Sequence, residues 1–159
     1  MISVPAMAKD MANANAGDVK VEFVKPEDFT DFATTSHGTK KDREALMSEF
    51  REDIQRVAGR YLPKGYHIDL KFHDINMAGD FEPQLGPQFD DVRIMKAIYP
   101  PSIFVEYTLT DPKGQTIASG RRRETDLAFE QIVTFRTDDH LFYVTELVIN
   151  LLREVTSSV

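Results

Sequence analysis

Two amphipathic helices stand out in the alternation of apolar and polar positions along the chain. Over residues 39–62 apolar side chains recur at spacings of three and four, which places them on one helix face. Thr39, followed by Asp42 three residues later, suits the start of this helix, and Pro63 suits its end. A second helix is predicted over residues 140–156 and would be capped by Asp138 or Asp139. The two apolar stripes are Leu46, Met47, Phe50, Ile54, Val57, Ala58 and Tyr61, then Leu141, Val144, Val148, Leu151, Leu152 and Val155.

Strict alternation of apolar and polar residues predicts strands over residues 19–24, 66–75 and 103–109. A short edge strand is expected over residues 92–98, because Pro100 and Pro101 follow it. Residues 127–129 and 132–135 are short apolar pieces without a clear period, and we expect both to be extended.

The tetrad from Asp111 to Gly114 predicts a type I turn with a glycine bulge, followed by one more strand. This turn would pair Leu109 with Ile117, whereas a plain four-residue loop would pair Leu109 with Thr116. We expect the bulged register, since only that one keeps both apolar residues on one face. It also predicts that Arg121 and Arg123 lie on the inner side of the sheet, where they would need partners.

These elements predict an α+β fold. A largely antiparallel sheet would carry both helices on one face, in the order β-α-β-β-β-α. Residues 18–159 are expected to form one domain. Residues 1–17 read as a disordered leader or as the remnant of a signal peptide, since small residues flank single positions between Ser3 and Ala8 as they do before a signal cleavage site. The signal-peptide interpretation predicts a periplasmic or secreted protein.

Composition narrows the possible functions. The formal net charge of −7 argues against nucleic acid as the main partner, because phosphate repels an acidic surface. The absence of cysteine excludes disulfides and thiol nucleophiles. No apolar run is long enough to span a bilayer. The chain carries none of the usual hydrolase, metalloprotease, phosphate-loop or dinucleotide motifs, so a catalytic function is less favoured and no catalytic residue is predicted.

Three segments in order carry a resemblance to a known family. They run from Val19 through Asp31, from Asp74 to Pro83, and from Val92 to Pro101 with Tyr107 and Gly114 beyond. Together they resemble a bacterial family of exported proteins known as domain of unknown function 3016. The resemblance spans most of residues 19–155 and implies an envelope or secreted protein, with no catalytic residues to transfer. Asn76 stands where a second aspartate is expected, which weakens a metal-binding interpretation.

The connection that follows the strand over residues 66–75 is strongly acidic. It carries five carboxylates between positions 74 and 92, with no Lys or Arg among them. Residues 74–79 match part of a calcium-loop pattern, but Ala78 and Leu85 stand where ligands are required. A looser calcium site built from Asp74, Asp80, Glu82 and Asp90 is the alternative. We expect instead that hydrogen bonds from Asx side chains, together with Arg93 and residues 121–123, order the connection without a metal or other cofactor.

Two functional hypotheses remain. The first is a non-catalytic periplasmic binding or assembly module that uses residues 77–91 and the neighbouring sheet edge to bind an unknown envelope protein or ligand. Its candidate binding residues are Asp74, Asp80, Phe81, Glu82, Phe89, Asp90, Arg121 and Arg123. The second is a hydrolase of envelope polymers that uses paired carboxylates of the same region. Exposure of Phe81, Leu85 and Phe89 would favour the first, and a cleft lined by two of the carboxylates would favour the second.

Overall fold

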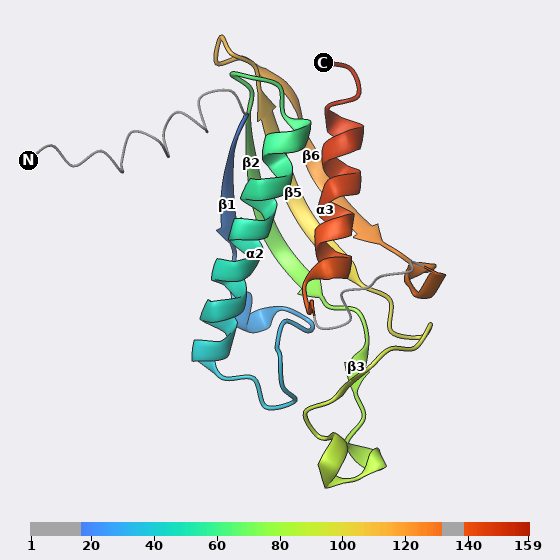
Figure 1. Ribbon diagram of the computed structural model, residues 1–159. Helices are drawn as coiled ribbons and strands as arrows, with labels where there is room; N and C mark the ends of the chain where they lie inside the picture. Colours follow the sequence, from blue (N-terminus) through green and yellow to red (C-terminus); the bar gives the residue numbers. More distant parts are fainter. Residues whose placement is uncertain (1–16, 132–138) are drawn as a thin grey trace, which may run out of the picture.

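A computed structural model describes residues 17–131 and 139–159. The N-terminal leader and the extended piece expected over residues 132–135 lie outside the described residues. Within them, four strands form the main sheet in the order β1-β2-β5-β6 (Figure 1). Their bounds are β1 Asp18–Phe23, β2 His67–Asn76, β5 Ser102–Thr110 and β6 Thr116–Thr125.

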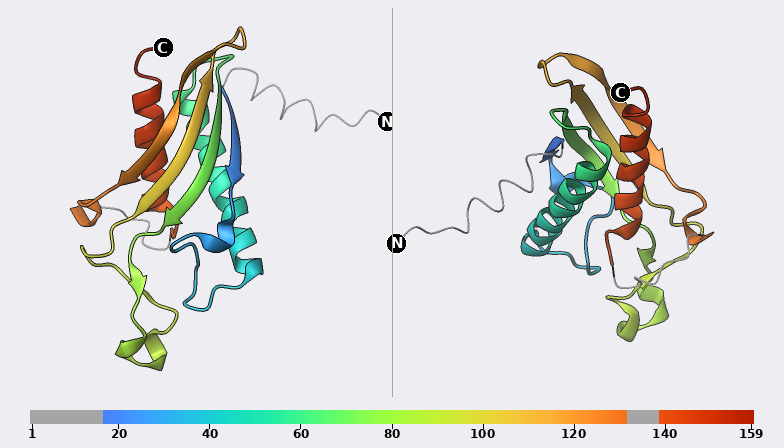
Figure 2. Two further views of the ribbon diagram at one scale, coloured as in Figure 1. Left: turned by 180° about the vertical axis from the view of Figure 1, so that it is seen from behind. Right: turned by 45° about the horizontal axis from the view of Figure 1, so that its top comes forward.

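The sheet is mixed. β1 runs parallel to β2, because the long helix α2 (Lys40–Tyr61) crosses over between them. The β2–β5 and β5–β6 pairs are antiparallel. Both α2 and the C-terminal helix α3 (Phe142–Val155) cover the same face, and no helix formed by the described residues lies on the other face (Figure 2). The predicted α+β class, element order and one-sided helix layer are confirmed. Among the described residues, no helix combines the length and apolar character that a bilayer span requires.

The helix starts differ in how they are capped. Thr39 forms the predicted capping box with Asp42, each side chain bonding to the other residue's backbone N–H. At α3 the N-cap is Leu141, without a side-chain cap, so the predicted aspartate cap is wrong there. Asp139 instead accepts a hydrogen bond from the N–H of Leu141 at 3.1 Å, and Leu141 is the residue just before the first helical residue, Phe142. Phe129 begins a 3₁₀ turn, Phe129–Gln131, and is not extended as predicted.

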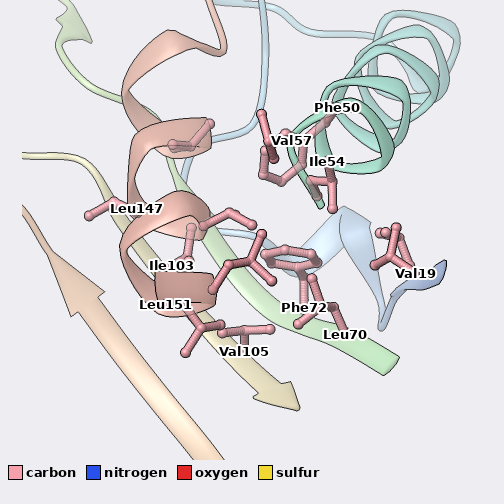
Figure 3. Packing of buried hydrophobic residues seen from close by; sticks show 14 of the residues in the cluster. Val19, Phe50, Ile54, Val57, Leu70, Phe72, Ile103, Val105, Leu147 and Leu151 are labelled. Carbon is pink, nitrogen blue, oxygen red and sulfur yellow. The ribbon is translucent and has the colours of Figure 1, made fainter. Parts of the chain in front are cut away.

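The core fills the space between the sheet and the two helices (Figure 3). It combines Val19, Leu70, Phe72, Ile103 and Val105 of the sheet with Phe50, Ile54, Val57, Leu147 and Leu151 of the helices. Five phenylalanines, Phe23, Phe29, Phe32, Phe50 and Phe72, pack with ring centroids 5.3–6.5 Å apart. Two of these rings, Phe29 and Phe32, come from the segment after β1, so aromatic packing anchors that segment beneath α2.

β2 contains a bulge, which departs from the strict alternation predicted for residues 66–75. Phe72 and Ile75 are both fully buried, although three positions separate them and regular alternation would send them to opposite faces. The pairing with β5 shifts between Phe72 and Asp74, which returns Ile75 to the core face opposite Ile103. The same shift leaves Asp74 on the outer face, opposite Phe104.

The predicted register of the β5–β6 hairpin is wrong. The turn forms with Gly114 in the left-handed region at φ +81°, but a second irregularity pairs Leu109 with Ala118 and leaves Ile117 exposed. Side chains on β6 therefore alternate in the opposite sense from the prediction. Arg122 lies on the helix side, where it donates to both carboxylate oxygens of Glu154 on α3, at 2.9 and 2.6 Å. Arg121 and Arg123 lie on the outer face.

The connection between β2 and β5 forms a lobe, which we define as residues 79–99. It projects beyond the end of the sheet and helices (Figure 1). Two short antiparallel strands, β3 (Asp80–Phe81) and β4 (Arg93–Ile94), lie at its base, and the 3₁₀ turns Pro83–Leu85 and Pro87–Phe89 form its tip. The predicted edge strand over residues 92–98 is thus reduced to two residues, which pair with β3 and not with the main sheet.

Candidate functional site

The lobe exposes large apolar side chains. Ile98 is 72% exposed and Phe89 is 37% exposed, and Leu85, Val92 and Met95 lie between these values. These five residues are the apolar surface of the lobe. Phe81 is only half-buried and sits against the guanidinium of Arg93, so it is not a free anchor. Large exposed apolar side chains that are concentrated in one short segment of the chain favour an interaction site there.

Arg93 holds the base of the lobe. Its side chain is only 8% exposed and makes a bidentate pair with Asp31, at 2.6 and 3.0 Å. It also donates to the carbonyls of Ala33, at 2.8 Å, and Gly79, at 3.1 Å. The Phe81 ring covers the guanidinium with its centroid 4.5 Å away. One side chain therefore ties β4 to the segment after β1 and to β3, and the planar donor fork of arginine suits this role.

Gly79 lets the two ends of the lobe meet. Its N–H donates to the Tyr99 carbonyl at 3.0 Å, and its φ of +77° lies in the left-handed region. A Cβ at this position would come within 2.8 Å of the Ile94 carbonyl oxygen and of the Met95 sulfur. Glycine is therefore required both for the backbone conformation and for the close approach of β4.

Glu82 forms a second lock inside the lobe. It is only 3% exposed, and its Oε1 accepts from Lys96 Nζ at 2.6 Å and from the Tyr99 hydroxyl at 2.8 Å. These hydrogen bonds, first from Lys96 and then from Tyr99, hold the pKa of the Glu82 carboxyl below its ordinary value. The same contact raises the pKa of Lys96 and that of Tyr99. Glu82 is therefore ionised, and its carboxylate binds Lys96 and Tyr99 within the lobe.

The remaining carboxylates of the connection have separate surroundings. Asp74 accepts from the N–H and hydroxyl of Thr30, at 2.7 and 2.8 Å. Asp80 accepts from the Phe81 N–H at 2.7 Å, and Asp91 accepts from the Ser36 hydroxyl at 3.3 Å. Asp90 caps the end of the turn Pro87–Phe89 through its backbone N–H. The four oxygen donors of the looser calcium hypothesis thus have different partners, and within residues 17–131 and 139–159 no three His, Asp or Glu side chains are placed to hold a metal ion.

The two outer arginines of β6 lie beside the sheet, not beside the lobe. Arg121 pairs with Glu106 at 3.3 Å. Arg123 lies over the Phe104 ring, 4.8 Å from its centroid, and reaches Asp74 at 3.9 Å. Of the arginines expected to order the acidic connection, Arg93 does so at close range and Arg123 touches only its first residue. Arg121 therefore does not lie with the candidate binding residues of the acidic connection.

A groove of about 600 Å³ lies between the segment after β1 and the base of the lobe. Of the five carboxylates in the connection, only Asp80 lines it. Two further carboxylates line its walls, Glu27 and Asp31, and Asp31 is bound to Arg93. Several of the groove's hydroxyls also have internal partners: Thr30 donates to Asp74, Thr39 to Asp42, and Tyr99 to Glu82. The groove therefore lacks the pair of carboxylates from the connection that the hydrolase hypothesis requires.

The sequence located part of this surface. Of the predicted anchors Phe81, Leu85 and Phe89, the last two are exposed on the lobe. The strand predicted over residues 92–98 hides the exposure of Val92, Met95 and Ile98 from the sequence analysis. A signal was present in the sequence, because the neighbouring apolar pairs Ile94-Met95 and Ala97-Ile98 break the alternation that a half-buried strand requires. Arg93 was expected only as a counter-charge, and its pairing with Asp31 joins residues far apart in the sequence.

Comparisons with known proteins give a family. The family model described as "Protein of unknown function (DUF3016)" matches residues 17–154. No similar protein was found among curated proteins. One similar solved structure is that of a minor lipoprotein from Acinetobacter baumannii, with 8% identity and a TM-score of 0.25 over 88% of this chain and 89% of that chain. Values this low support no conclusion about this chain. The family match covers nearly all of the described residues, and the chain therefore belongs to the family described as Protein of unknown function (DUF3016).

Proposed function

We propose that this protein is a non-catalytic binding or assembly module of the bacterial envelope, and that it docks a protein through the apolar surface of the lobe. The observation that carries the proposal is the exposure of Leu85, Phe89, Val92, Met95 and Ile98 on a lobe whose base is fixed by buried polar contacts. None of these five side chains belongs to the core cluster.

The fixed base favours binding over mere solvent exposure. Arg93 and Glu82 hold the lobe in one conformation before any partner arrives, so association need not order it. Phenylalanine and methionine are both enriched at protein interfaces, and truncating such buried anchors usually removes much of the binding energy. Two of the five residues of the apolar surface, Phe89 and Met95, are of these types.

The envelope location rests on the sequence. The small-residue pattern near Ser3 and Ala8 is typical of the end of a secretory signal. The hydrolase alternative has less support, since a pair of free carboxylates from the connection does not meet in the groove.

Site-specific photo-crosslinking in cells of the native host tests the proposal. A photoreactive phenylalanine analogue is placed at Phe89 in one variant and at Met95 in another. The control position is Ile117, which is exposed to a similar degree (42%) in the bulge near the β5–β6 turn, at the far end of the sheet from the lobe.

We expect one discrete protein adduct from both lobe positions and none of that size from Ile117. An excess of unlabelled protein should compete for the adduct, and the same excess of a Phe89→Ser, Met95→Ser variant should not. Adducts that are equal at Ile117, or that persist with either competitor, would remove the lobe as the docking surface.

A further inference from the structure

The charges around the apolar surface of the lobe have one sign. The lobe carries four carboxylates, Asp80, Glu82, Asp90 and Asp91, against two basic residues, Arg93 and Lys96. Both basic groups are already committed, Arg93 to Asp31 and Lys96 to Glu82, each at 2.6 Å. No cationic group of the lobe is left free to meet an acidic partner.

Three lobe carboxylates keep their charge available. Asp80 and Asp91 accept only neutral donors, the Phe81 N–H and the Ser36 hydroxyl. Across residues 17–131 and 139–159, no Lys or Arg lies within ion-pair distance of Asp80, Asp90 or Asp91. Asp90 and Asp91 stand between Phe89 and Val92 in the chain, so two of these negative charges border the apolar surface itself.

We propose that the docking partner is an amphipathic protein segment whose apolar face is flanked by lysine or arginine. This inference rests on the proposed function and names the chemistry of the partner at the same lobe. An acidic partner would place like charges against Asp90 and Asp91, which costs binding energy, and a basic one would gain complementary contacts and faster association. An anionic lipid surface is repelled by the same carboxylates.

The form of the partner follows from the shape of the site. The lobe is a protrusion that exposes apolar side chains, and the apolar face of an amphipathic helix with basic flanks can cover them. The charged contacts would lie at the rim, where they contribute mainly to association rate and partner choice. Binding should therefore weaken with added salt, and the apolar contacts should persist.

Two synthetic peptides serve as probes. One is an amphipathic helix former built from a Lys-Leu-Ala repeat, and its match is the same peptide with every lysine replaced by glutamate. Each is titrated into the isotope-labelled protein, and backbone amide shifts are followed by NMR. We expect the lysine peptide to move amides of residues 79–99 and to bind at least about tenfold more tightly than the glutamate peptide, as two well-placed charge contacts imply.

Variants separate the apolar and the charged contributions. Phe89→Ser combined with Met95→Ser should abolish binding of the lysine peptide, and Ile117→Ser should leave it unchanged. Asp90→Asn combined with Asp91→Asn keeps the size and shape of both side chains and removes their negative charges. This double variant should bring the affinities of the two peptides together and flatten the salt dependence.

The outcomes separate this inference from the proposed function. Equal affinity for the two peptides, or a preference for the glutamate peptide, would overturn the basic-partner inference, and the crosslinking result at Phe89 would stand by itself. Shifts that map outside residues 79–99 would overturn it as well. Tighter association with phosphatidylglycerol vesicles than with phosphatidylcholine vesicles, lost in the Phe89→Ser, Met95→Ser variant, would assign the lobe to a membrane surface instead.

Discussion

At the scale of single residues, the conformation of the lobe depends on two buried charged side chains, Arg93 and Glu82. Arg93 is nearly buried and binds four different oxygens of two segments, which are the segment after β1 (Asp31 and Ala33) and the start of the lobe (Gly79). Glu82 is a buried acid stabilised by one cation and one hydroxyl. Buried charges need paired and hydrogen-bonded partners. Glu82 finds them in Lys96 and Tyr99 within the lobe, and Arg93 finds its counter-charge in Asp31, outside the lobe.

Gly79 and Gly114 offer a matched pair for testing the close approach at the lobe base. Both have positive φ, +77° and +81°, but a Cβ at Gly114 would meet nothing within 4 Å. Gly114→Ala should cost about 1–2 kcal/mol of unfolding free energy from backbone strain alone. Gly79→Ala should cost clearly more, since its Cβ would collide with the Ile94 carbonyl. Chemical denaturation measures both, and equal losses would contradict the packing argument.

Glu82 predicts a pH dependence of the lobe. Because its pKa in the folded protein lies below the ordinary value of 4.5, the ionised form stabilises the folded lobe above that pH. This contribution is lost as the pH falls through the lowered pKa, when the carboxylate that Lys96 and Tyr99 bind becomes protonated. Amide protection factors of residues 79–99, corrected for intrinsic exchange, should therefore fall as the pH drops below the ordinary carboxyl pKa of 4.5 and through the lowered pKa of Glu82.

The Glu82→Gln variant is the control for this pH dependence. Glutamine has the same size and still accepts a hydrogen bond, but it carries no charge for Lys96 and does not titrate. Its lobe should be less protected near neutral pH and should show no additional loss of protection through the acidic range. A variant with the same acid-induced loss as the native protein would place the titration on another group.

At the scale of elements, the sequence predicted the strands and helices well and the pairing of β6 poorly. Alternation fixes which residues share a face of one strand, but the register between strands depends on the neighbours they meet. Ala118 is small enough to sit opposite Leu109 over the core, and Gly120 leaves room for the Tyr107 hydroxyl, 3.2 Å from where a Cβ would be. Arg122 then reaches Glu154 on α3, a contact between elements that strand alternation alone does not reveal.

Only part of the candidate site could be predicted from the sequence, because local patterns do not reveal contacts between elements. The position of the acidic connection and the anchors Leu85 and Phe89 could be read locally. The separation of Arg121 from the lobe followed from the unexpected register, and the commitment of Glu82 to Lys96 and Tyr99 depended on how the lobe folds back on itself. Contacts between residues distant in sequence carried the information that was missing.

Of Arg93 and the arginines at 121–123, we expect only Arg93 to stabilise the position of β4. Arg93→Ala breaks a mostly buried pair and leaves Asp31 without its cation, which should cost the lobe about 3 kcal/mol, the lower end of the range for such pairs. Hydrogen exchange should show faster opening of residues 79–99, with little change in α2 and α3. Arg121→Ala, which removes an exposed pair with Glu106, is the control and should leave the lobe unchanged. Loosening by both variants would contradict this assignment.

At the scale of the whole molecule, the core and the lobe have separate roles. All large core side chains come from the main sheet, the two helices and the segments next to them, and between Met77 and Ile103 no residue belongs to the core cluster. The amphipathic patterns of the helices and strands predicted this core because burial of one face is a local property of each element. The lobe has no such periodicity, so its fold is set by individual polar contacts.

This division predicts that the lobe can be removed without unfolding the protein. The Gly79 N–H and the Tyr99 carbonyl are hydrogen-bonded at 3.0 Å, so an Asn-Gly pair in place of residues 80–98 can close the β2–β5 connection as a short turn. The shortened protein should keep a single cooperative unfolding transition and its native circular dichroism, since no core side chain is lost. Its unfolding free energy should fall by about 3 kcal/mol, because Asp31 loses Arg93.

Replacing Asp31 by asparagine in the shortened protein tests the source of that loss. Asparagine removes the unpaired charge and leaves the backbone bonds to Ile75 and Met77 intact, so part of the lost stability should return. An excess of the same shortened protein should fail to compete for the crosslinked adduct, and the shortened protein should not bind the lysine peptide. A chain that fails to fold without the lobe would show that residues 80–98 support the sheet, and the exposed apolar side chains would then require an explanation in folding instead of in binding.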